Sequence, residues 1–267
     1  MATTETQICN MALQRMGQAL VDDITAASPS VNEAKCENIF DQERDELLLN
    51  GPEKGWKFAS RTYHGIDREE FTITAFTLAT ATTTTVTATH TLVAGDMVTI
   101  DGTTSYDGDY VVESVSTTVS FVITKTFVAD DATGTAYWTS NEYGYRYAVP
   151  TCKRVVAVKI GGLELTDWIH KGDYVLTNQE SDEVDMDIVK ALTSTVTSWP
   201  DHFVRVLVLK LAIALHYSMT QDLKAIQLLA FELSQALPKA IAIDEQRKYV
   251  KESSQSWQEV GNTQEVE

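Results

Sequence analysis

The feature that most constrains the fold of this chain is an abrupt change in composition between residues 71 and 140. This stretch contains 21 threonines, and no Lys or Arg occurs between Phe71 and Thr124. Thr and Val are β-branched and favour the pleated, half-buried surface of a sheet. Alternating runs at residues 84–89, 96–100, 109–115, 120–124 and 134–138 are separated by turn signals such as Asp107-Gly108. The pattern predicts an inserted β-barrel or sandwich of about five or six strands over residues 67–140.

The segments before this stretch are helical in pattern. Thr4-x-x-Gln7 and Ser30-x-x-Glu33 are capping boxes, in which the first side chain and the fourth satisfy each other's free backbone N–H groups. Apolar residues then recur at helical spacing, from residue 8 to 16 and from 36 to 47. The sequence therefore predicts two N-terminal helices.

Two more helices are predicted near the C-terminus. Pro200 suits the first turn of a helix, and an apolar face follows over residues 203–218. A fourth helix begins at Leu223, and we expect Pro238 to kink or stop it. From residue 251 the chain is polar and cannot fold alone, which predicts an extended C-terminal arm over residues 251–267.

A small antiparallel sheet is expected between the Thr-rich stretch and the third helix. Residues 155–160 alternate up to a hairpin turn at Gly161-Gly162, and strands follow at 163–168, 174–176 and 184–189. The predicted fold class is therefore α+β. About four helices from both ends form a bundle with this sheet (residues 1–66 and 141–250), and the all-β domain is inserted at 67–140.

The charge balance excludes several classes of partner. The chain has 21 basic and 38 acidic residues, a formal net charge of −17. A broad phosphate-binding surface needs Lys and Arg, so neither nucleic acid nor anionic lipid is an expected ligand. The apolar run at residues 204–215 is broken by Arg205 and Lys210, and we expect no membrane span. The three cysteines cannot all pair, and the N-terminus lacks the pattern of a secretory signal. Both observations indicate synthesis in a reducing cytoplasm.

No pattern typical of catalysis, cofactor binding or metal binding is present. The five histidines are scattered, and neither a phosphate loop nor a nucleophile elbow occurs. The best constellation is Glu183, Asp185 and Asp187, which would share one face of a strand. Such a face can bind a hard cation, but the sequence favours a solvated strand face opposite a buried one. We therefore expect no enzyme, no cofactor and no metal site.

Other conspicuous residues have structural interpretations. Asp107-Gly108-Asp109 is interpreted as a hairpin turn rather than a cation site, and His216 as a hydrogen-bonded core residue. Cys9 and Cys36 fall on helical apolar faces and are expected to be buried. The aromatic residues Trp56, Phe58 and Tyr63 could stack on nucleic-acid bases, but in so acidic a chain we expect them to pack in the core instead. Trp257 is different, because a tryptophan in a tail without a core is typical of an interface anchor.

Several segments resemble the head-to-tail adaptors of bacteriophages, the tail tubular protein A family. The similarity lies in residues 3–17 (TTETQICNMALQRMG), 33–37 (EAKCE), 40–47 (FDQERDEL), 56–59 (WKFA), 145–150 (YRYAVP) and the helix 203–219. It spans about residues 1–65 and 143–250. At residues 67–140 the family usually has a short connection, and this segment looks like small β-domains threaded into various phage tail proteins.

The resemblance implies a structural virion protein that assembles as a ring of about twelve copies beneath the portal. Such a ring extends the channel, receives a tail nozzle or tail tube protein, and lets genomic DNA pass without specific binding. It would lie at the head–tail junction of the virion and, during assembly, in the host cytoplasm. The family's C-terminal segment commonly reaches towards the portal. The candidate contacts with the portal or a neighbouring subunit are therefore Tyr249, Val250, Trp257 and Val260.

Two other functions remain open at this stage. The first is a binding module, a tail or baseplate protein whose β-insert recognises a fibre or a cell-surface glycan. The second is a hydrolase, for which the sequence offers no support.

Overall fold

The computed structural model describes residues 4–192 and 199–261, with side chains as far as Gln246. The chain is α+β, with four helices and several antiparallel sheets over these residues. It divides into two compact units. The helical unit comprises Met1–Arg61, Thr151–Val156 and Ile188–Glu267, and the β unit comprises Thr62–Pro150 and Ala157–Asp187.

The first two helices begin where their capping boxes predict. At the start of α1 (Glu5–Arg15), the Thr4 hydroxyl accepts from the Gln7 backbone N at 3.2 Å, and the Gln7 side chain accepts from the Thr4 N at 3.1 Å. Ser30 and Glu33 form the second box, at the start of α2 (Val31–Leu49). The apolar side of each helix is buried, as its spacing predicts.

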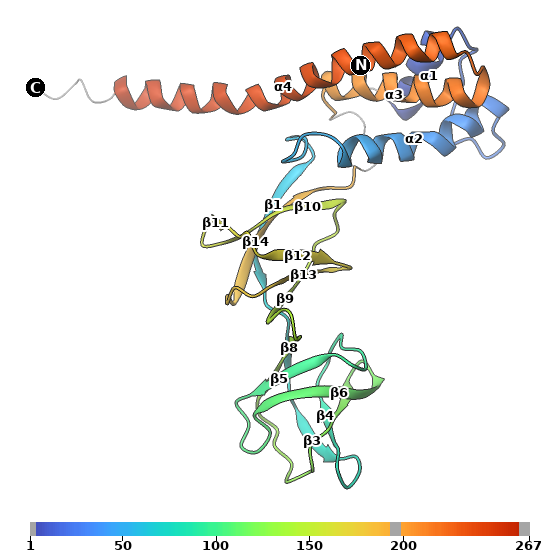
Figure 1. The fold of residues 1–267 in the computed structure, drawn as a ribbon. Coiled ribbons are helices and arrows are strands. Elements are labelled where there is room, and N and C mark those ends of the chain that lie inside the picture. The colour runs from blue at the N-terminus through green and yellow to red at the C-terminus, as the bar shows by residue number, and fades with distance from the viewer. Residues whose placement is uncertain (1–3, 193–198, 262–267) are drawn as a thin grey trace, which may run out of the picture. The chain divides into compact units, whose positions relative to one another are not determined.

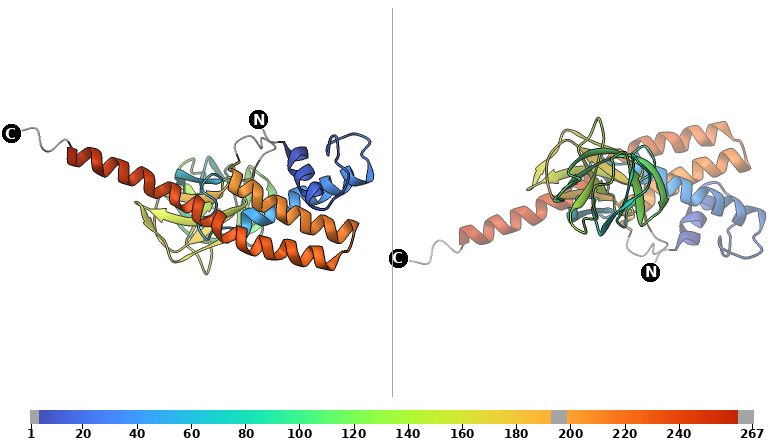
Figure 2. Two further views of the ribbon diagram at one scale, coloured as in Figure 1. Left: turned by 90° about the horizontal axis from the view of Figure 1, so that it is seen from above. Right: turned by 90° about the horizontal axis from the view of Figure 1, so that it is seen from below.

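The third helix, α3 (Asp201–Met219), is the central element of the helical unit. Its N-cap is Pro200, and its side chains Phe203, Leu207 and Leu211 are completely buried. They pack in one apolar core with residues of α1, α2 and α4 (Leu223–Gly261). Figures 1 and 2 show α3 and the first part of α4 running side by side.

The fourth helix continues past Pro238, where we expected a kink or a stop. A proline inside a helix costs about 3 kcal/mol, because it lacks an N–H and its ring crowds the preceding turn. Core contacts on both sides of it, from Leu237 before and Ala240 after, offset this cost. The helix then continues to Gly261, because adding a turn to an existing helix needs no new nucleus. Residues 251–261 are therefore helical, whereas we expected an extended arm.

Two helical stretches could cross a membrane by length and composition alone: α3 and Leu223–Gln246 of α4. Half of the α3 stretch is buried inside the unit. The Lys210 Nζ of α3 lies 2.9 Å from a Glu46 carboxylate oxygen and 3.5 Å from one of Glu43, both in α2. These features fit the central helix of a globular bundle. Most of the α4 stretch is exposed, and its apolar side chains are considered with the candidate site.

The largest sheet of the β unit has seven antiparallel strands in the order β2-β8-β5-β6-β7-β4-β3. Five of them lie where alternation predicts strands: β4 (Thr84–Thr87), β5 (Met97–Asp101), β6 (Gly108–Thr117), β7 (Ser120–Ile123) and β8 (Thr135–Thr139). The edge strands β2 (Glu70–Thr72) and β3 (Ala75–Leu78) were not predicted. Phe76 and Tyr106 stack at the centre of its core, with ring centroids 4.0 Å apart.

The sheet is rolled but open, so of the two predicted alternatives, a β-barrel or a sandwich, the closed barrel is not formed. Its two edge strands are consecutive in the chain and are joined only by Ile73 and Thr74. The Ile73 N–H donates to Gly134 and the Thr74 N–H to Thr87, which ties this corner to the strands next to both edges. β2 and β3 do not pair with each other, so the roll stays unclosed.

The remaining strands form two sheets, where we predicted one. One has the order β1-β14-β10-β11, and its strands are β1 (Ser60–Asp67), β10 (Arg154–Ile160), β11 (Leu163–Glu164) and β14 (Glu183–Val189). The other has the order β12-β13-β9, and its strands are β9 (Tyr145–Ala148), β12 (Trp168–Lys171) and β13 (Tyr174–Thr177). The two-residue hairpin at Gly161 and Gly162 is confirmed, and both glycines have the positive φ that this turn requires.

The division into units differs from the predicted domain boundaries. Composition changes near residues 67 and 140, but most of the side strands cluster with the Thr-rich sheet rather than with the helices. Leu176 of β13 shows why, because it packs into the same core as Phe76 and Tyr106. A change in composition therefore does not coincide with a boundary between cores here.

Candidate functional site

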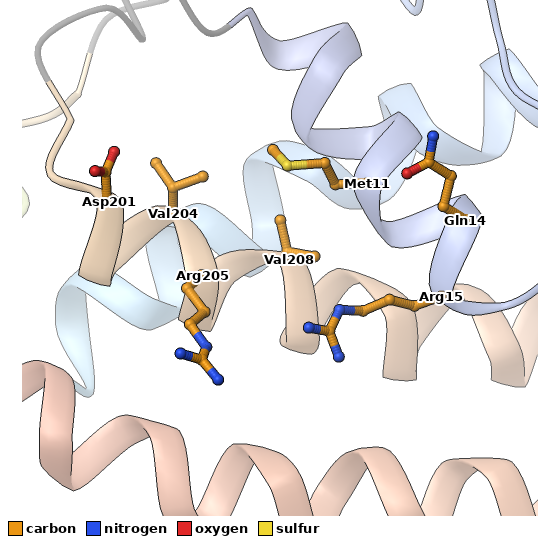
Figure 3. A pocket seen from close by; sticks show the side chains of 7 residues that line it. All are labelled: Met11, Gln14, Arg15, Asp201, Val204, Arg205 and Val208. Carbon is orange, nitrogen blue, oxygen red and sulfur yellow. The ribbon is translucent and has the colours of Figure 1, made fainter.

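A groove of about 580 Å³ lies on the helical unit between α1 and α3 (Figure 3). Its apolar lining comes from Met11 of α1 and from Val204 and Val208 of α3. The side chains of Arg15 and Arg205 extend along the same side of the groove, from α1 and α3 respectively (Figure 3). Arg15 is paired with Glu232 at 2.7 Å, and Asp201 also lines the groove. An apolar lining with a polar rim of this kind suits an amphipathic partner.

A second hollow of about 380 Å³ lies between α3 and α4. Ala236, Ala240 and Ile243 of α4 line it, together with the cation Lys239. Arg205 lines both hollows and is exposed, and no carboxylate among the described residues pairs with it. Asp201 lines both hollows as well, so this part of the helical unit carries both signs of charge.

A buried carboxylate holds α4 against the rest of the helical unit. Asp244 is 1% exposed, and its Oδ2 accepts from the backbone N of Lys57 at 2.7 Å. Its Oδ1 lies 3.3 Å from Nε2 of His202, at the start of α3. The Lys57 ammonium also donates to the backbone carbonyl of Glu245 at 2.9 Å. These contacts join three segments that are far apart in the sequence.

The substitution Asp244→Ala is expected to lower the free energy of unfolding by about 2–4 kcal/mol, because it leaves a buried N–H and a buried imidazole without their acceptor. Chemical denaturation of the full chain, followed by circular dichroism at 222 nm, measures this. The matched control is Glu245→Ala, since the Glu245 side chain is exposed and only its backbone carbonyl is used. We expect the control to stay within about 0.5 kcal/mol of the parent. Equal effects of the two substitutions would contradict the role of Asp244.

The outward side of α4 carries several exposed apolar side chains among polar ones. Leu228 and Phe231 are 61% and 64% exposed, and their spacing of three places them next to each other on one side of the helix. Leu223 and Ile243 are also exposed on this helix. The buried residues Ile226 and Leu229 face the core instead. Exposed apolar patches of this kind are typical of protein–protein contacts.

The acidic strand predicted as a possible cation site has local partners instead. Asp185 of β14 accepts from the Gly65 N–H and lies 3.0 Å from Nδ1 of His64, and these hydrogen bonds lower its pKa. Burial raises the pKa of Asp187, but hydrogen bonds from Lys159 and Thr62 lower it by more, so the net shift of the pKa is downward.

Glu183 begins this strand and is exposed, so the predicted alternation of buried and solvated residues is confirmed. Within residues 4–192 and 199–246, no three His, Cys, Asp or Glu side chains are grouped so that they could hold a metal ion.

The structural interpretations of the other conspicuous residues are confirmed. Cys9 and Cys36 are buried. His216 is 4% exposed, and its Nδ1 lies 2.6 Å from the Thr220 hydroxyl. Trp56 is buried, packs edge-on against Phe203 and donates from its indole N to the Leu47 carbonyl at 2.9 Å.

The remaining members of these groups also lie in ordinary structural positions. Phe58 packs against Phe203 in the same core, whereas Tyr63 lies on β1 in the β unit. Asp107 ends the loop between β5 and β6, and Gly108 and Asp109 already belong to β6, so the hairpin turn predicted at these three residues is not formed there. Asp107 accepts from the Thr103 backbone N, and Asp109 accepts from the Thr99 hydroxyl of β5.

For the predicted arm residues, the structure describes the backbone alone. Tyr249, Val250, Trp257 and Val260 belong to α4, but their side chains lie outside the described residues. Sequence reasoning missed Arg205 and Asp244 as residues of the site. A polar residue among the apolar neighbours Ile241 and Ile243 is the signal by which Asp244 could have been found.

No protein-family model matches this chain, and no curated protein sequence matches it.

Proposed function

We propose that this protein is a structural virion protein of a bacteriophage, a ring-forming head-to-tail adaptor. In this role it docks beneath the portal, extends the DNA channel and attaches the tail. The proposal also treats residues 67–140 as an inserted β module and the region from residue 251 as the arm that contacts the portal or a neighbour. The protein is then an assembly component rather than an enzyme.

The observation that carries this proposal is a pair of different exposed surfaces on one helical unit. The first is the outward side of α4, with Leu228 and Phe231. The second is the groove between α1 and α3, with Met11 and Val208 in its lining and Arg205 at its rim. The two surfaces share no residue, and none of the described side chains covers either of them.

A contact between two unlike surfaces of identical copies is head-to-tail. Repeated with a constant rotation, such a contact produces a closed ring or an open helical filament, whereas a twofold dimer would need one surface that pairs with itself. The arrangement of α1, α3 and α4 therefore supports a ring better than it supports a dimer.

The positions of the phage-like motifs agree with this interpretation. Residues 3–17 supply the cap and the buried side of α1, and residues 56–59 pack against α3. The resembling residues thus build the core and caps of the unit that carries the two surfaces. The net charge of −17 fits a channel component, because like charge keeps DNA from adhering to the protein.

Mass photometry of the purified full chain tests the proposal. The protomer mass is 29.6 kDa, and we expect a discrete species of about twelve times this mass, or of another fixed multiple that closes a ring. A monomer or dimer at micromolar concentration, with and without the portal protein of the same phage, would contradict it.

A further inference from the structure

The β unit contains a cavity that the proposed assembly does not use. Its volume is about 610 Å³, within the range of roughly 300–1,000 Å³ that is usual for small-ligand sites. The loop between β8 and β9 forms one wall, with Glu142 and Tyr143, and the end of β8 contributes Trp138. Ile169 and Lys171 of β12, with Leu176 of β13, line it as well.

The loop wall is held rigidly by its own hydrogen bonds. The Ser140 hydroxyl accepts from the Tyr143 N–H at 2.9 Å, and the Ser140 N–H donates to the Tyr143 carbonyl at 2.9 Å. The Asn178 side chain then accepts from the Gly144 N–H at 3.1 Å and donates to the Glu142 carbonyl at 2.9 Å. Since the backbone is satisfied internally, the side chains of this loop remain available for a ligand.

The indole of Trp138 is fixed in place as well. The guanidinium of Arg146 lies over it, 4.7 Å from the ring, and is itself held by Glu69 and by the Thr91 hydroxyl. Trp138 is 7% exposed, yet its indole N–H has no acceptor among the described residues. Buried donors without a partner are uncommon, and an ordered water is one group that can supply the missing acceptor.

The other polar groups of the cavity are also unused. The Glu142 carboxylate and the Lys171 ammonium, which belong to exposed residues, and the Tyr143 hydroxyl make no hydrogen bond or ion pair within the part of the chain that the structure describes. The cavity therefore combines an apolar lining (Ile169, Leu176) with donors and acceptors that have no partner.

We propose that this cavity binds a saccharide of one or two sugar rings. A sugar presents C–H faces that pack on apolar and aromatic side chains, and its hydroxyls both donate and accept. A phosphate ligand would be opposed by the carboxylate of Glu142, and a purely apolar ligand would make no use of that carboxylate or of the Lys171 ammonium, both of which belong to exposed residues that line the cavity. The main competitor is a peptide, because β12 is an edge strand to which an extended chain could add. The proposal does not depend on ring formation.

The test uses the full-length protein on an immobilised panel of bacterial surface oligosaccharides (lipopolysaccharide core, O-antigen and peptidoglycan fragments), beside a panel of random peptides. Any glycan that binds is then titrated by calorimetry. The double substitution Glu142→Gln/Lys171→Met removes the two charged groups at the cavity, and Trp138→Phe removes the indole N–H but keeps an aromatic ring. The matched control is Glu113→Gln/Lys125→Met, which changes the same residue types in the β unit but outside the cavity.

We expect at least one oligosaccharide to bind the parent, the Glu142/Lys171 variant to bind it at least about tenfold more weakly, and the control to stay within about twofold of the parent. Weaker binding by Trp138→Phe, with an unchanged circular dichroism spectrum, would support the same site. The proposal would be overturned if no oligosaccharide bound, if the cavity and control variants bound alike, or if only peptides were captured.

Discussion

The double substitution Leu228→Glu/Phe231→Glu is expected to convert assembled rings of this protein into protomers. Both side chains are more than half exposed on α4, so the fold of the protomer should not change. Burying each of them at a subunit contact contributes about 1.5–3 kcal/mol, and a buried carboxylate would add a desolvation cost. We therefore expect the contact between subunits to weaken by at least about 100-fold, as measured by mass photometry over a dilution series.

The matched control places the same charges on exposed apolar residues outside α4. Leu20 and Val31 are 54% and 72% exposed on the helical unit, so Leu20→Glu/Val31→Glu introduces two carboxylates at comparable positions. We expect this variant to assemble like the parent. If it dissociated to the same extent as the α4 variant, added charge rather than the α4 surface would be responsible.

Removal of the chain after Val250 is expected to abolish stable attachment to the portal while leaving the fold intact. The lost segment carries Trp257 and Val260, two of the residues predicted to contact the portal or a neighbouring subunit. Burying one such tryptophan in a partner is worth about 2–4 kcal/mol, and the repetition of this contact around a ring multiplies its effect. Trp257→Ala should therefore weaken attachment as well, but less than the truncation does.

Co-sedimentation of each variant with portal particles measures this attachment, and circular dichroism verifies that the helices remain. The control is Gln258→Ala, which removes the polar neighbour of Trp257. Attachment of the truncated protein at the level of the parent would mean that the arm is dispensable and that the helical bundle alone provides docking.

Local signals in the sequence predicted the starts of elements well. The capping boxes at Thr4 and Ser30 place the N-termini of α1 and α2 correctly, because these motifs satisfy backbone groups within a single turn. Alternation found five of the seven strands in the large sheet. It missed β2 and β3, which have three and four residues, although it found β4 and β7, which have four residues each.

Features that depend on tertiary contacts were not predictable in the same way. The roll of the large sheet stays open because its edge strands β2 and β3 do not pair with each other, and no local sequence pattern predicts this. The continuation of α4 through Pro238 depends on core contacts from both sides. The groove at Arg205 and the contact between Asp244 and Lys57 each join residues that are distant in sequence, so only the folded structure reveals them.

Electron microscopy of the purified protein, alone and mixed with portal particles of the same phage, tests the central claim most directly. The account predicts closed rings of one size that sit coaxially on the portal with their channels aligned. Particles without a central channel, or a portal that remains bare in the presence of excess protein, would contradict it.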